Sequence, residues 1–397
     1  MKAILVFLSA WTLSANAWAV TYSDLLPNVI NQLPQKQELV DFQALSSANQ
    51  MAADSWIAGD VALNLKHEND ALTGNQGFES WEGGARFPIW LPGQSSSRQQ
   101  IGNAYQSLNQ VGRQHIQLLA SKQLRQLVWQ TKKAKVSLKF AYKDLKQTQT
   151  LVALVSQKVD AGESPKFDLL LAQKSLFKAQ KNVAQKEAAY QVALQNYTQW
   201  TQQSDLPSPL AETLASTTLT LEQHPDYQMM QAQVQAEQAK LELTKASQRG
   251  NPSVYVGAKN ERDKQTSDNS ILIAEVSFPI GADPTAPSRI AEQRQAVSQR
   301  QIAQNQAKQK LQLNLIRAKE AWVAAQKTEQ LSQQQNTLSE EAMQLAKMAY
   351  RQGETSIQNL LLMKQQYFED KLNFKLAQLN RLEAIANLNQ ALGVSLK

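Results

Sequence analysis

The chain of 397 residues contains no cysteine, carries a formal net charge of +7 and is 42% hydrophobic. The absence of cysteine excludes disulfides, thiolate metal sites, a cysteine nucleophile and anchoring through a lipidated N-terminal cysteine. The basic residues are spread through Lys- and Gln-rich segments, whereas nucleic-acid binding needs a clustered basic face, so we expect no nucleic-acid partner.

Residues 1–19 have the pattern of a targeting segment. Lys2 provides a short positive region, residues 4–13 form an apolar run, and "AWA" at 17–19 is a small-x-small cleavage site. The run is shorter than the roughly 20 residues that a spanning helix needs. We therefore expect a cleaved signal peptide and a mature chain that begins near Val20, with an uncleaved anchor as the alternative. No other stretch is apolar for long enough to form a transmembrane helix, which excludes an inner-membrane channel.

Short sequence landmarks recur at a constant shift of 191 residues, which indicates a duplicated unit. The recurring pairs are Phe87-Pro88-Ile89 with Phe278-Pro279-Ile280, Ser97-Arg98 with Ser288-Arg289, and Gly162-Glu163 with Gly353-Glu354. We expect two structural repeats, residues 20–210 and 211–397, within a single architecture.

Each repeat contains a predicted pair of strands, at about 56–88 and 253–280. Apolar and other residues alternate there with the period of two that is typical of a strand with one apolar face. The apolar-face positions are Val61, Leu63 and Leu65, then Trp81, Gly83, Ala85 and Phe87, and in the second repeat Leu272, Ala274, Val276 and Phe278. The opposite face includes Asn64, Lys66, Glu82 and Arg86. An ordinary sandwich needs more strands than these four.

A very long helix follows each strand pair, at about 98–160 and 289–351. Neither stretch contains proline, and each could extend roughly 95 Å. The first has a coiled-coil seam at Leu124, Leu127, Thr131, Ala134, Leu138, Ala141, Leu145, Thr148, Val152, Val155 and Val159. The second has a weaker seam that we expect to change phase, at Leu311, Leu315, Ala318, Trp322 and Ala325, then Leu338, Ala342, Leu345 and Ala349.

The Gly-Glu segments are predicted hairpin tips. A glycine just past a helix end is a common stop signal, and helices at about 164–203 and 355–392 would return from the two tips. Ser164-Pro165 offers an N-cap followed by proline in the first helical position. Residues 355–358 offer a capping box of the form T-x-x-Q.

No residues in the sequence indicate catalysis or a bound cofactor. His67, His115 and His224 lie in a strand, a long helix and a loop, without the spaced partner that a helical metal site needs. The chain has no phosphate-binding loop, nucleophile elbow or Gly-rich nucleotide turn. We therefore expect no enzyme activity, no cofactor and no metal site.

These features together resemble the outer-membrane efflux proteins of the TolC type. The segments that carry the resemblance are "HPDYQMMQAQVQAEQAKLELTKASQRGNPSVYVG", the "FPI" that ends each strand pair, and the tips "AGESPKFDLLLAQ" and "RQGETSIQNLLLMKQ". The match covers nearly all of the mature chain. The Gly-Glu tips and "FPIWLPGQ" are more similar to the heavy-metal-efflux branch than to the founding member.

The resemblance implies a mainly α fold with a small membrane β-part, built from a duplicated unit of helix, β-hairpin, long helix, tip and helix. It implies a homotrimer in the outer membrane, with a 12-stranded β-barrel continued by a periplasmic α-helical barrel. Barrel physics agrees, since four strands cannot enclose a channel and open edges are not tolerated in lipid. The apolar strand faces would contact lipid and the polar faces the lumen.

The function that the resemblance implies is the exit duct of a tripartite efflux pump. Its partners would be a periplasmic adaptor (membrane fusion) protein and an inner-membrane transporter. The alternative is a periplasmic coiled-coil adaptor or scaffold without a channel.

Two groups of candidate functional residues follow from the resemblance. The residues expected to dock the adaptor are Gly162, Glu163, Ser164, Gly353, Glu354 and Thr355. The family closes its tunnel with acidic residues six and nine positions after the second tip glycine, where this chain has Asn359 and Leu362. Asp168 stands six positions after Gly162, so the candidate gate is Asp168, Leu171, Asn359 and Leu362. An acidic ring and an apolar closure both stay open, and Asp168 could instead be a first-turn acid favoured by the helix dipole.

Overall fold

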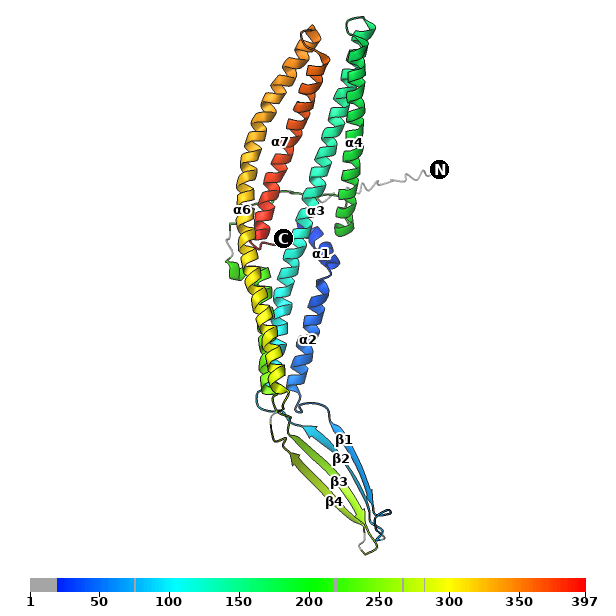
Figure 1. Cartoon of the computed structure of the whole chain (residues 1–397), viewed down its shortest axis with the longest axis vertical. Helices are drawn as coiled ribbons and strands as arrows, with labels where there is room; N and C mark the ends of the chain where they lie inside the picture. The colour runs from blue at the N-terminus through cyan, green and yellow to red at the C-terminus, as the bar shows by residue number, and fades with distance from the viewer. Residues whose placement is uncertain (1–19, 75, 217–219, 266–267, 282) are drawn as a thin grey trace, which may run out of the picture.

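The computed structural model describes residues 20–74, 76–216, 220–265, 268–281 and 283–397. The molecule is elongated, with a β-sheet at one end and the turns of two helical hairpins at the other (Figure 1). The predicted signal peptide lies outside the described residues.

From α2 and from α5 onward, the two halves of the chain contain the same order of elements. The first half consists of α1 (Tyr22–Gln32), α2 (Lys36–Asp54), β1 (Ala62–Asn69), β2 (Glu79–Pro88), α3 (Gln94–Asp160) and α4 (Lys166–Thr201). The second consists of the 3₁₀ turn η1 (Leu221–Gln223), α5 (Pro225–Ala246), β3 (Ser253–Arg262), β4 (Asn269–Ser277), α6 (Ala286–Gln352) and α7 (Ile357–Ala391). The long helices α3 and α6 each contain 67 residues.

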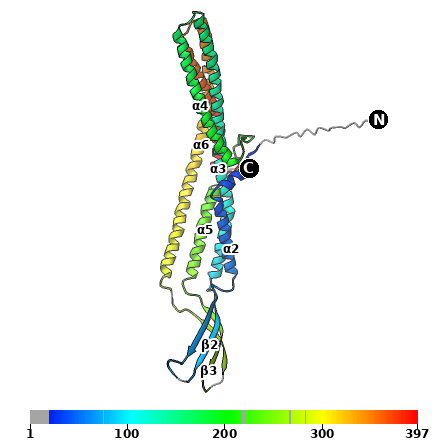
Figure 2. The same ribbon diagram turned by 90° about the vertical axis from the view of Figure 1, so that its right-hand side faces the viewer.

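The long helices form two antiparallel hairpins, α3 with α4 and α6 with α7. Contacts between α3 and α7 join the hairpins side by side. Nearer the sheet, α2 packs on α3, and α5 packs on both α3 and α6 (Figure 2). As a result α3 is surrounded by other helices, whereas α6 has neighbours along only part of its circumference.

The predicted seam of the first long helix is confirmed. Six of its positions are buried, namely Leu124, Leu127, Thr131, Ala141, Thr148 and Val155, and the other five are half-buried. The buried hydroxyl of Thr131 donates to the carbonyl oxygens of Leu127 at 2.8 Å and Ala193 at 3.2 Å. The polar seam position is therefore satisfied, as a buried hydroxyl must be.

The predicted change of phase in the second seam is wrong. Leu338 and Leu345 are 67% and 63% exposed. The three-four spacing continues without interruption from Ala325 through Glu329, Ser332, Asn336, Ser339, Met343 and Ala346 to the buried Tyr350. Two of these polar residues bond to α7: Arg381 Nε donates to Glu329 Oε2 at 2.5 Å, and the Ser339 hydroxyl donates to Asp370. Because polar pairs form the middle of this seam, a search for apolar periodicity selects the exposed leucines instead.

Both returning helices begin one residue later than predicted. Pro165 is the N-cap of α4 rather than its first helical residue, and Ser356 rather than Thr355 caps α7. The backbones of Pro165 (φ −69°, ψ 150°) and Ser356 (φ −78°, ψ 157°) are still extended, which sets the boundary there. The Ser356 hydroxyl accepts a hydrogen bond from the Asn359 amide at 3.3 Å, as an N-cap side chain does.

The four strands form one antiparallel sheet in the order β1-β2-β3-β4. The central pair, β2 and β3, joins the two halves in a register that places Gly84 opposite Gly257. Within the described residues, β1 and β4 each have one unpaired edge.

A buried ion pair joins both halves at mid-length. Arg125 of α3 is 2% exposed, and its Nε and Nη2 donate to the two carboxylate oxygens of Glu212 at 2.8 and 2.7 Å. The same guanidinium donates to Gln390 Oε1 at 2.6 Å and to the Val394 carbonyl at 3.1 Å. Beside it lies a hydrophobic cluster whose members include Leu25, Val29, Leu124, Val128, Tyr197 and Leu396. The centre of the molecule therefore contains segments from the start, middle and end of the described chain.

Candidate functional site

The two faces of the sheet differ in chemistry, as the alternation predicted, although Ile271 and Ile273 of β4 lie on the charged face. The pairing register places Leu63, Leu65, Trp81, Ala85, Phe87, Val254, Val256, Leu272, Ala274 and Val276 on one face. The other face carries charges that pair along and across strands, through Lys66–Glu68 at 2.7 Å, Lys259–Glu261 at 2.8 Å and Arg86–Glu275 at 3.4 Å. Asn64, Lys66, Glu82 and Arg86 all lie on this charged face.

Tyr255 is the central side chain of the charged face. It is 2% exposed, and its hydroxyl donates to Glu82 Oε1 at 2.9 Å. A Cβ on Gly84 or on Gly257 would come within 2.6 Å of Tyr255 atoms, so both glycines provide the space in which the phenol lies. The Arg86 guanidinium sits 5.4 Å from the ring centroid, within cation–π range. Tyr255 therefore covers the middle of this face and contacts two charged residues of the neighbouring strand β2.

The apolar face is open to its surroundings. Leu63, Leu65, Leu272 and Val276 are all exposed, as are the ring of Trp81 and that of Phe278 just beyond β4. None of the helices in the described part of the chain has a stretch that is both long and apolar enough to cross a bilayer. A continuous exposed apolar surface of this kind marks an interaction site with lipid or protein.

The two predicted tips have the same backbone geometry. Gly162 and Gly353 adopt left-handed conformations, with φ of 75° and 80°. In each tip the following glutamate amide donates to the carbonyl five residues earlier, Glu163 to Lys158 at 2.8 Å and Glu354 to Ala349 at 2.9 Å. This bond is the mark of a Schellman turn, for which glycine is favoured. Both glutamate side chains are exposed at the ends of the hairpins, and the backbone bonds of the turn do not involve their carboxylates. The Glu163 carboxylate lies 4.0 Å from the Lys158 ammonium.

The candidate gate residues lie in different environments. Asp168 is half-buried in the first turn of α4, and its charge contributes, after burial, to raising the pKa of the buried Tyr350 on α6. Leu171 packs against the tip cluster that contains Val155, Ala172, Ile357 and Leu360. Asn359 hydrogen-bonds its own turn through Thr355, at 3.3 Å. Leu362 is exposed.

Sequence reasoning missed an ion pair that joins the two hairpins near the tips. Lys364 of α7 is buried and donates to Asp144 of α3, whose carboxylate also lies 3.5 Å from the Thr148 hydroxyl. The Lys364 ammonium lies 5.3 Å from the centroid of the Phe368 ring. Lys364 and Asp144 are 220 residues apart in sequence, so only the packing of the hairpins brings them together.

Two of the three histidines meet at one aspartate, which the sequence did not indicate. His115 Nδ1 of α3 lies 2.8 Å from Asp226 Oδ1 on α5, and His224 Nδ1 accepts from the Asp226 amide at 3.2 Å. Burial lowers the pKa of His224. The charge of His115 also lowers this pKa, whereas the charge of Asp226 raises it by less than the total lowering. Burial tends to raise the pKa of Asp226, but the hydrogen bond and charges of the histidines outweigh it and lower the pKa. The described residues contain no cluster of three or more side chains arranged to hold a metal ion.

No protein-family model matches this chain, and no curated protein matches it significantly in sequence. Solved structures do match it over nearly the whole chain. VceC, an outer membrane protein from Vibrio cholerae, matches with a TM-score of 0.74 at 11% identity, over 94% of this chain and 96% of VceC. CusC, which forms a transmembrane channel, matches with a TM-score of 0.73 at 16% identity, over 97% of this chain and 96% of CusC. The CmeC outer membrane channel of Campylobacter jejuni matches with a TM-score of 0.69 at 12% identity, over 99% and 93%.

The chain therefore has the fold of the TolC-family outer-membrane efflux channels. The resemblance predicted from sequence is confirmed at the level of fold, and so is the mainly helical architecture with a small antiparallel sheet. Channels of this fold are not enzymes.

Proposed function

We propose that the chain is one subunit of a trimeric outer-membrane channel that serves as the exit duct of a tripartite efflux pump. The observation that carries the proposal is the open sheet, with one apolar face, one charged face and an unpaired edge at each side. Unpaired backbone groups cost several kcal/mol each in hydrocarbon, so such a sheet needs further strands before it can enter a bilayer. The fold shared with outer-membrane channels supports copies of the same chain as their source.

Three copies of the four-stranded sheet would supply twelve strands, with β4 of one copy beside β1 of the next. The strands contain 8–10 residues, which gives about 26–33 Å at roughly 3.3 Å per residue. Tilted by the usual angle, this length fits the apolar band of about 25 Å in outer-membrane barrels. The apolar face would then contact lipid, and the charged face around Tyr255 would line the lumen.

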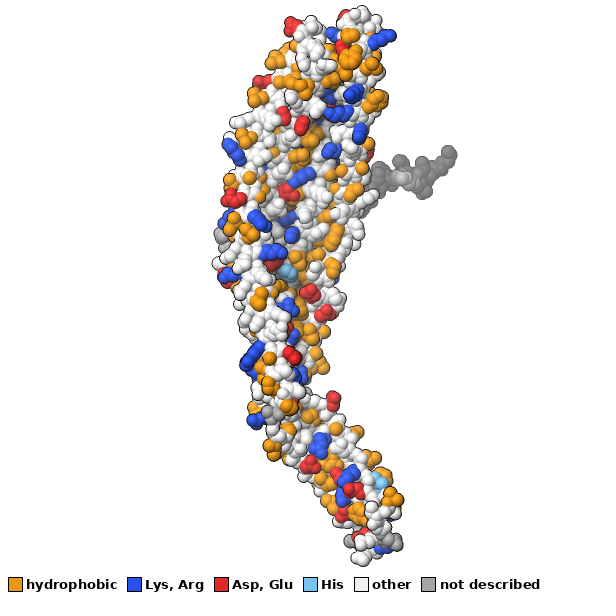
Figure 3. Space-filling view, viewed as in Figure 1, with side chains coloured by type: hydrophobic (Ala, Val, Ile, Leu, Met, Phe, Trp, Pro, Cys, Tyr) orange, Lys and Arg blue, Asp and Glu red, His pale blue; other side chains and the backbone are white. Residues whose placement is uncertain are grey.

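Exposed apolar stripes on the outer helices support a barrel that continues through the helical part. Leu331, Leu338 and Leu345 recur every seven residues along α6, and Phe167, Leu170 and Phe177 mark a stripe on α4. Hydrophobic side chains lie along the outer helices in the space-filling view (Figure 3). Because α3 and α7 contact each other within one subunit, α4 and α6 remain for contacts with neighbouring subunits. Three copies around one axis would bury both stripes.

The proposal is tested by isolating the full-length protein from membranes. We expect it in the outer-membrane fraction as a heat-resistant trimer that conducts ions in planar bilayers. A monomeric barrel would contradict the trimer. Purification as a soluble periplasmic protein would favour the alternative, an adaptor or scaffold without a channel.

We infer that the tips dock a periplasmic adaptor, which connects the channel to an inner-membrane transporter. The turn geometry needs the two glycines but not the exposed carboxylates of Glu163 and Glu354. Replacing both glutamates with lysine should weaken crosslinking to the adaptor while the trimer level stays the same. Glu222→Lys, an exposed substitution at mid-length, is the matched control. Crosslinking at the wild-type level in the double variant would reduce these residues to turn formers.

The tip sequences favour a pump of the heavy-metal-efflux branch, so that a metal cation would be cargo rather than a resident cofactor. Loss of the gene should then sensitise cells to a metal ion more than to organic drugs. The export of the chain with a cleaved signal peptide and without lipidation belongs to the same proposal, and the mass of the N-terminal peptide of the purified trimer checks it.

A further inference from the structure

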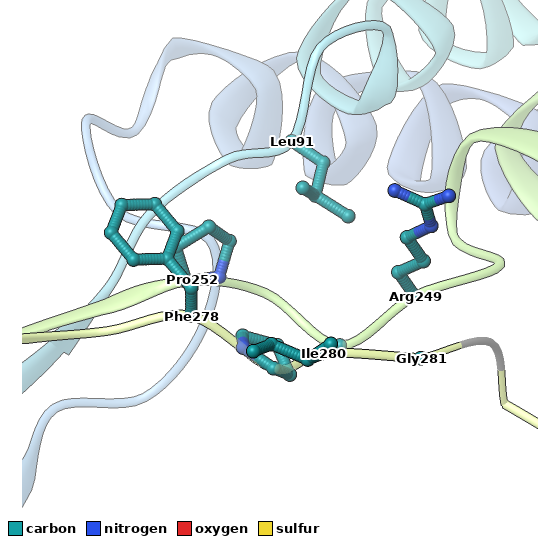
Figure 4. A pocket seen from close by; sticks show the side chains of 8 residues that line it. Leu91, Arg249, Pro252, Phe278, Ile280 and Gly281 are labelled. Carbon is teal, nitrogen blue, oxygen red and sulfur yellow. The ribbon is translucent and has the colours of Figure 1, made fainter.

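A pocket of about 390 Å³ lies where the sheet meets the helices. Its walls are Leu91 from the β2–α3 connection, Pro252 before β3, and Phe278, Pro279 and Ile280 after β4. Figure 4 shows Arg249 and Phe278 on opposite sides of the space below Leu91. Phe278 is 68% exposed and Ile280 is fully exposed. The pocket therefore combines an uncovered apolar wall with one cationic side chain.

Arg249 is the cationic side chain of this pocket. No hydrogen bond or ion pair joins its guanidinium to any other residue that the structure describes. Asp283, which lines the neighbouring pocket, is already bound to Arg289 at 2.7 Å. A free guanidinium beside an apolar surface is complementary to an anionic group that carries a hydrocarbon tail, since arginine binds phosphate through paired hydrogen bonds.

The first half of the chain contains an equivalent site, in which an aromatic side chain packs against the phenylalanine. Gly59 lies against Pro88 as Gly250 lies against Pro279, and each residue of the second pair is 191 positions after its counterpart. In the first half Trp56 stacks on Phe87 at 5.4 Å, and Phe87 is half-buried. In the second half Trp56 is replaced by Ser247, and Ala58 is replaced by Arg249. The second half therefore lacks the aromatic side chain that packs on the phenylalanine in the first half. It has an exposed apolar wall and a positive charge instead.

We propose that this pocket binds a phospholipid, with the headgroup phosphate on Arg249 and an acyl chain against Phe278 and Ile280. The inference rests on the proposed function, which places the apolar strand face in the membrane. Phe278 continues the apolar stripe of Leu272, Ala274 and Val276 to the end of the strand, so the pocket lies at the helix-side boundary of the hydrocarbon. Phosphates lie at this depth in the leaflet that faces the helices, and the acyl chain takes the place that Trp56 takes in the first half.

The experiment titrates palmitoyl-oleoyl phosphatidylglycerol into the detergent-purified full-length protein and counts bound lipids by native mass spectrometry. Arg249→Ala restores the alanine of the first half and should lower lipid affinity about tenfold, the equivalent of losing one charge-assisted hydrogen bond. Arg300→Ala, which removes the same charge from α6 and outside the pocket, should bind as the wild type does. Ile280→Ser should also weaken binding, because the acyl wall is lost.

Wild-type affinity in Arg249→Ala would overturn the proposal. Displacement of the lipid by millimolar inorganic phosphate would overturn it as well, since the pocket would then be a simple anion site. If Arg249→Ala lowers the yield of trimer and leaves lipid binding unchanged, a neighbouring copy rather than lipid fills the pocket. A failure of the proposed function would show earlier and separately, as a wild-type protein that is not a membrane trimer.

Discussion

The helices α3 and α6 have the same length and equivalent places in the two halves, yet they differ greatly in how much of their surface is buried. Of 67 residues in each, 21 are buried in α3 and 3 in α6. α3 is enclosed by α2, α4, α5 and α7, whereas α6 packs on α5 and α7 alone among the long helices. Equivalent local structure therefore does not imply equivalent burial, because each helix has its own place in the subunit.

The difference in burial is also seen at individual pairs of positions 191 residues apart. Arg125 is buried in α3, and its counterpart in α6 is the exposed Ile316. The buried Trp129 corresponds to the exposed Glu320. A buried arginine in α3 and an exposed isoleucine at the equivalent position of α6 are the opposite of what a lone soluble subunit would favour. In the proposed trimer, this difference would make α3 the helix that organises each subunit and would leave α6 for contacts between subunits.

The strongest test of this division is to charge the α6 stripe. Replacing Leu338 and Leu345 with lysine should lower the trimer fraction more than about tenfold, because unpaired ammonium groups would be buried at every subunit contact. Size-exclusion chromatography with light scattering measures the fraction. Gln333→Lys with Gln344→Lys adds the same charge to another exposed face of α6 and should leave the trimer intact. A normal trimer in the leucine variant would mean that α6 does not form the contact.

The second test compares Arg125 with Ile316. Arg125→Ala should lower the free energy of unfolding by about 3–5 kcal/mol, because it leaves the Glu212 carboxylate buried and unpaired. Ile316→Ala should change the stability of the subunit by less than about 0.5 kcal/mol. Denaturant unfolding followed by circular dichroism measures both. The double variant Arg125→Met with Glu212→Met should lose less than Arg125→Ala, and an equal or greater loss would contradict the explanation by an unpaired charge.

The third test uses acid to loosen the contact between α3 and α5. The folded-state pKa of His224 lies below its unfolded value near 6.5, so the unfolded chain binds more protons and stability falls as the pH drops below about 6.5. Asp226 has a lowered pKa, so its contribution is present above its unfolded value of 3.8 and is lost only in stronger acid. The denaturation midpoint should therefore decrease between pH 7.5 and pH 5.

His224→Asn is the matched variant for this test, since asparagine also caps a helix but does not titrate. Its midpoint should decrease less over the same pH range. An identical decrease in the variant and the wild type would assign the pH dependence to other groups.

The smallest expected effect concerns Asp168 and Asn359, which occupy equivalent positions in the two tips. If three Asp168 carboxylates surround the channel axis, they repel one another and attract cations. Asp168→Asn should then lower the cation-to-anion permeability ratio of the undocked channel by about twofold, and Asn359→Asp should increase cation block. Bilayer recordings measure both. Unchanged selectivity in Asp168→Asn would make the residue a first-turn acid and assign closure to apolar residues such as Leu171 and Leu362.

Much of the fold could be predicted because its signals are local. Strand alternation, the three-four spacing at Leu124 to Val159 and the tip glycines depend on neighbours within a few residues. The second seam could not be found in this way, since Glu329 and Ser339 are satisfied by Arg381 and Asp370 on another helix. The start of α7 was misplaced by one residue because Thr355 and Ser356 are both good caps, and only the backbone dihedrals distinguish them.

The candidate site could be predicted only where it is built from single segments. The two faces of the strands and the two tips were identifiable, because each lies within one short stretch of chain. The pairs Arg125–Glu212, Lys364–Asp144 and His115–Asp226 were not, since their partners are brought together by helix packing over separations of 87, 220 and 111 residues. The Arg249 pocket was hidden for the same reason, although the exchange of Ala58 for arginine at the repeat shift was visible in the sequence.

The cluster at the middle of the molecule also limits how the chain can acquire its structure. The Leu396 amide donates to the Ser121 hydroxyl at 2.9 Å across 275 residues, and Leu396 packs with Leu25 and Val128. Closing such distant contacts is slow, because the entropy of a long loop is lost before any contact forms. The hairpins can form early from local pairing, but the central cluster can form only after almost the entire chain has been synthesised. During that interval the apolar strands are exposed to aggregation, so folding should depend on a chaperone that binds extended chains until the last helix arrives.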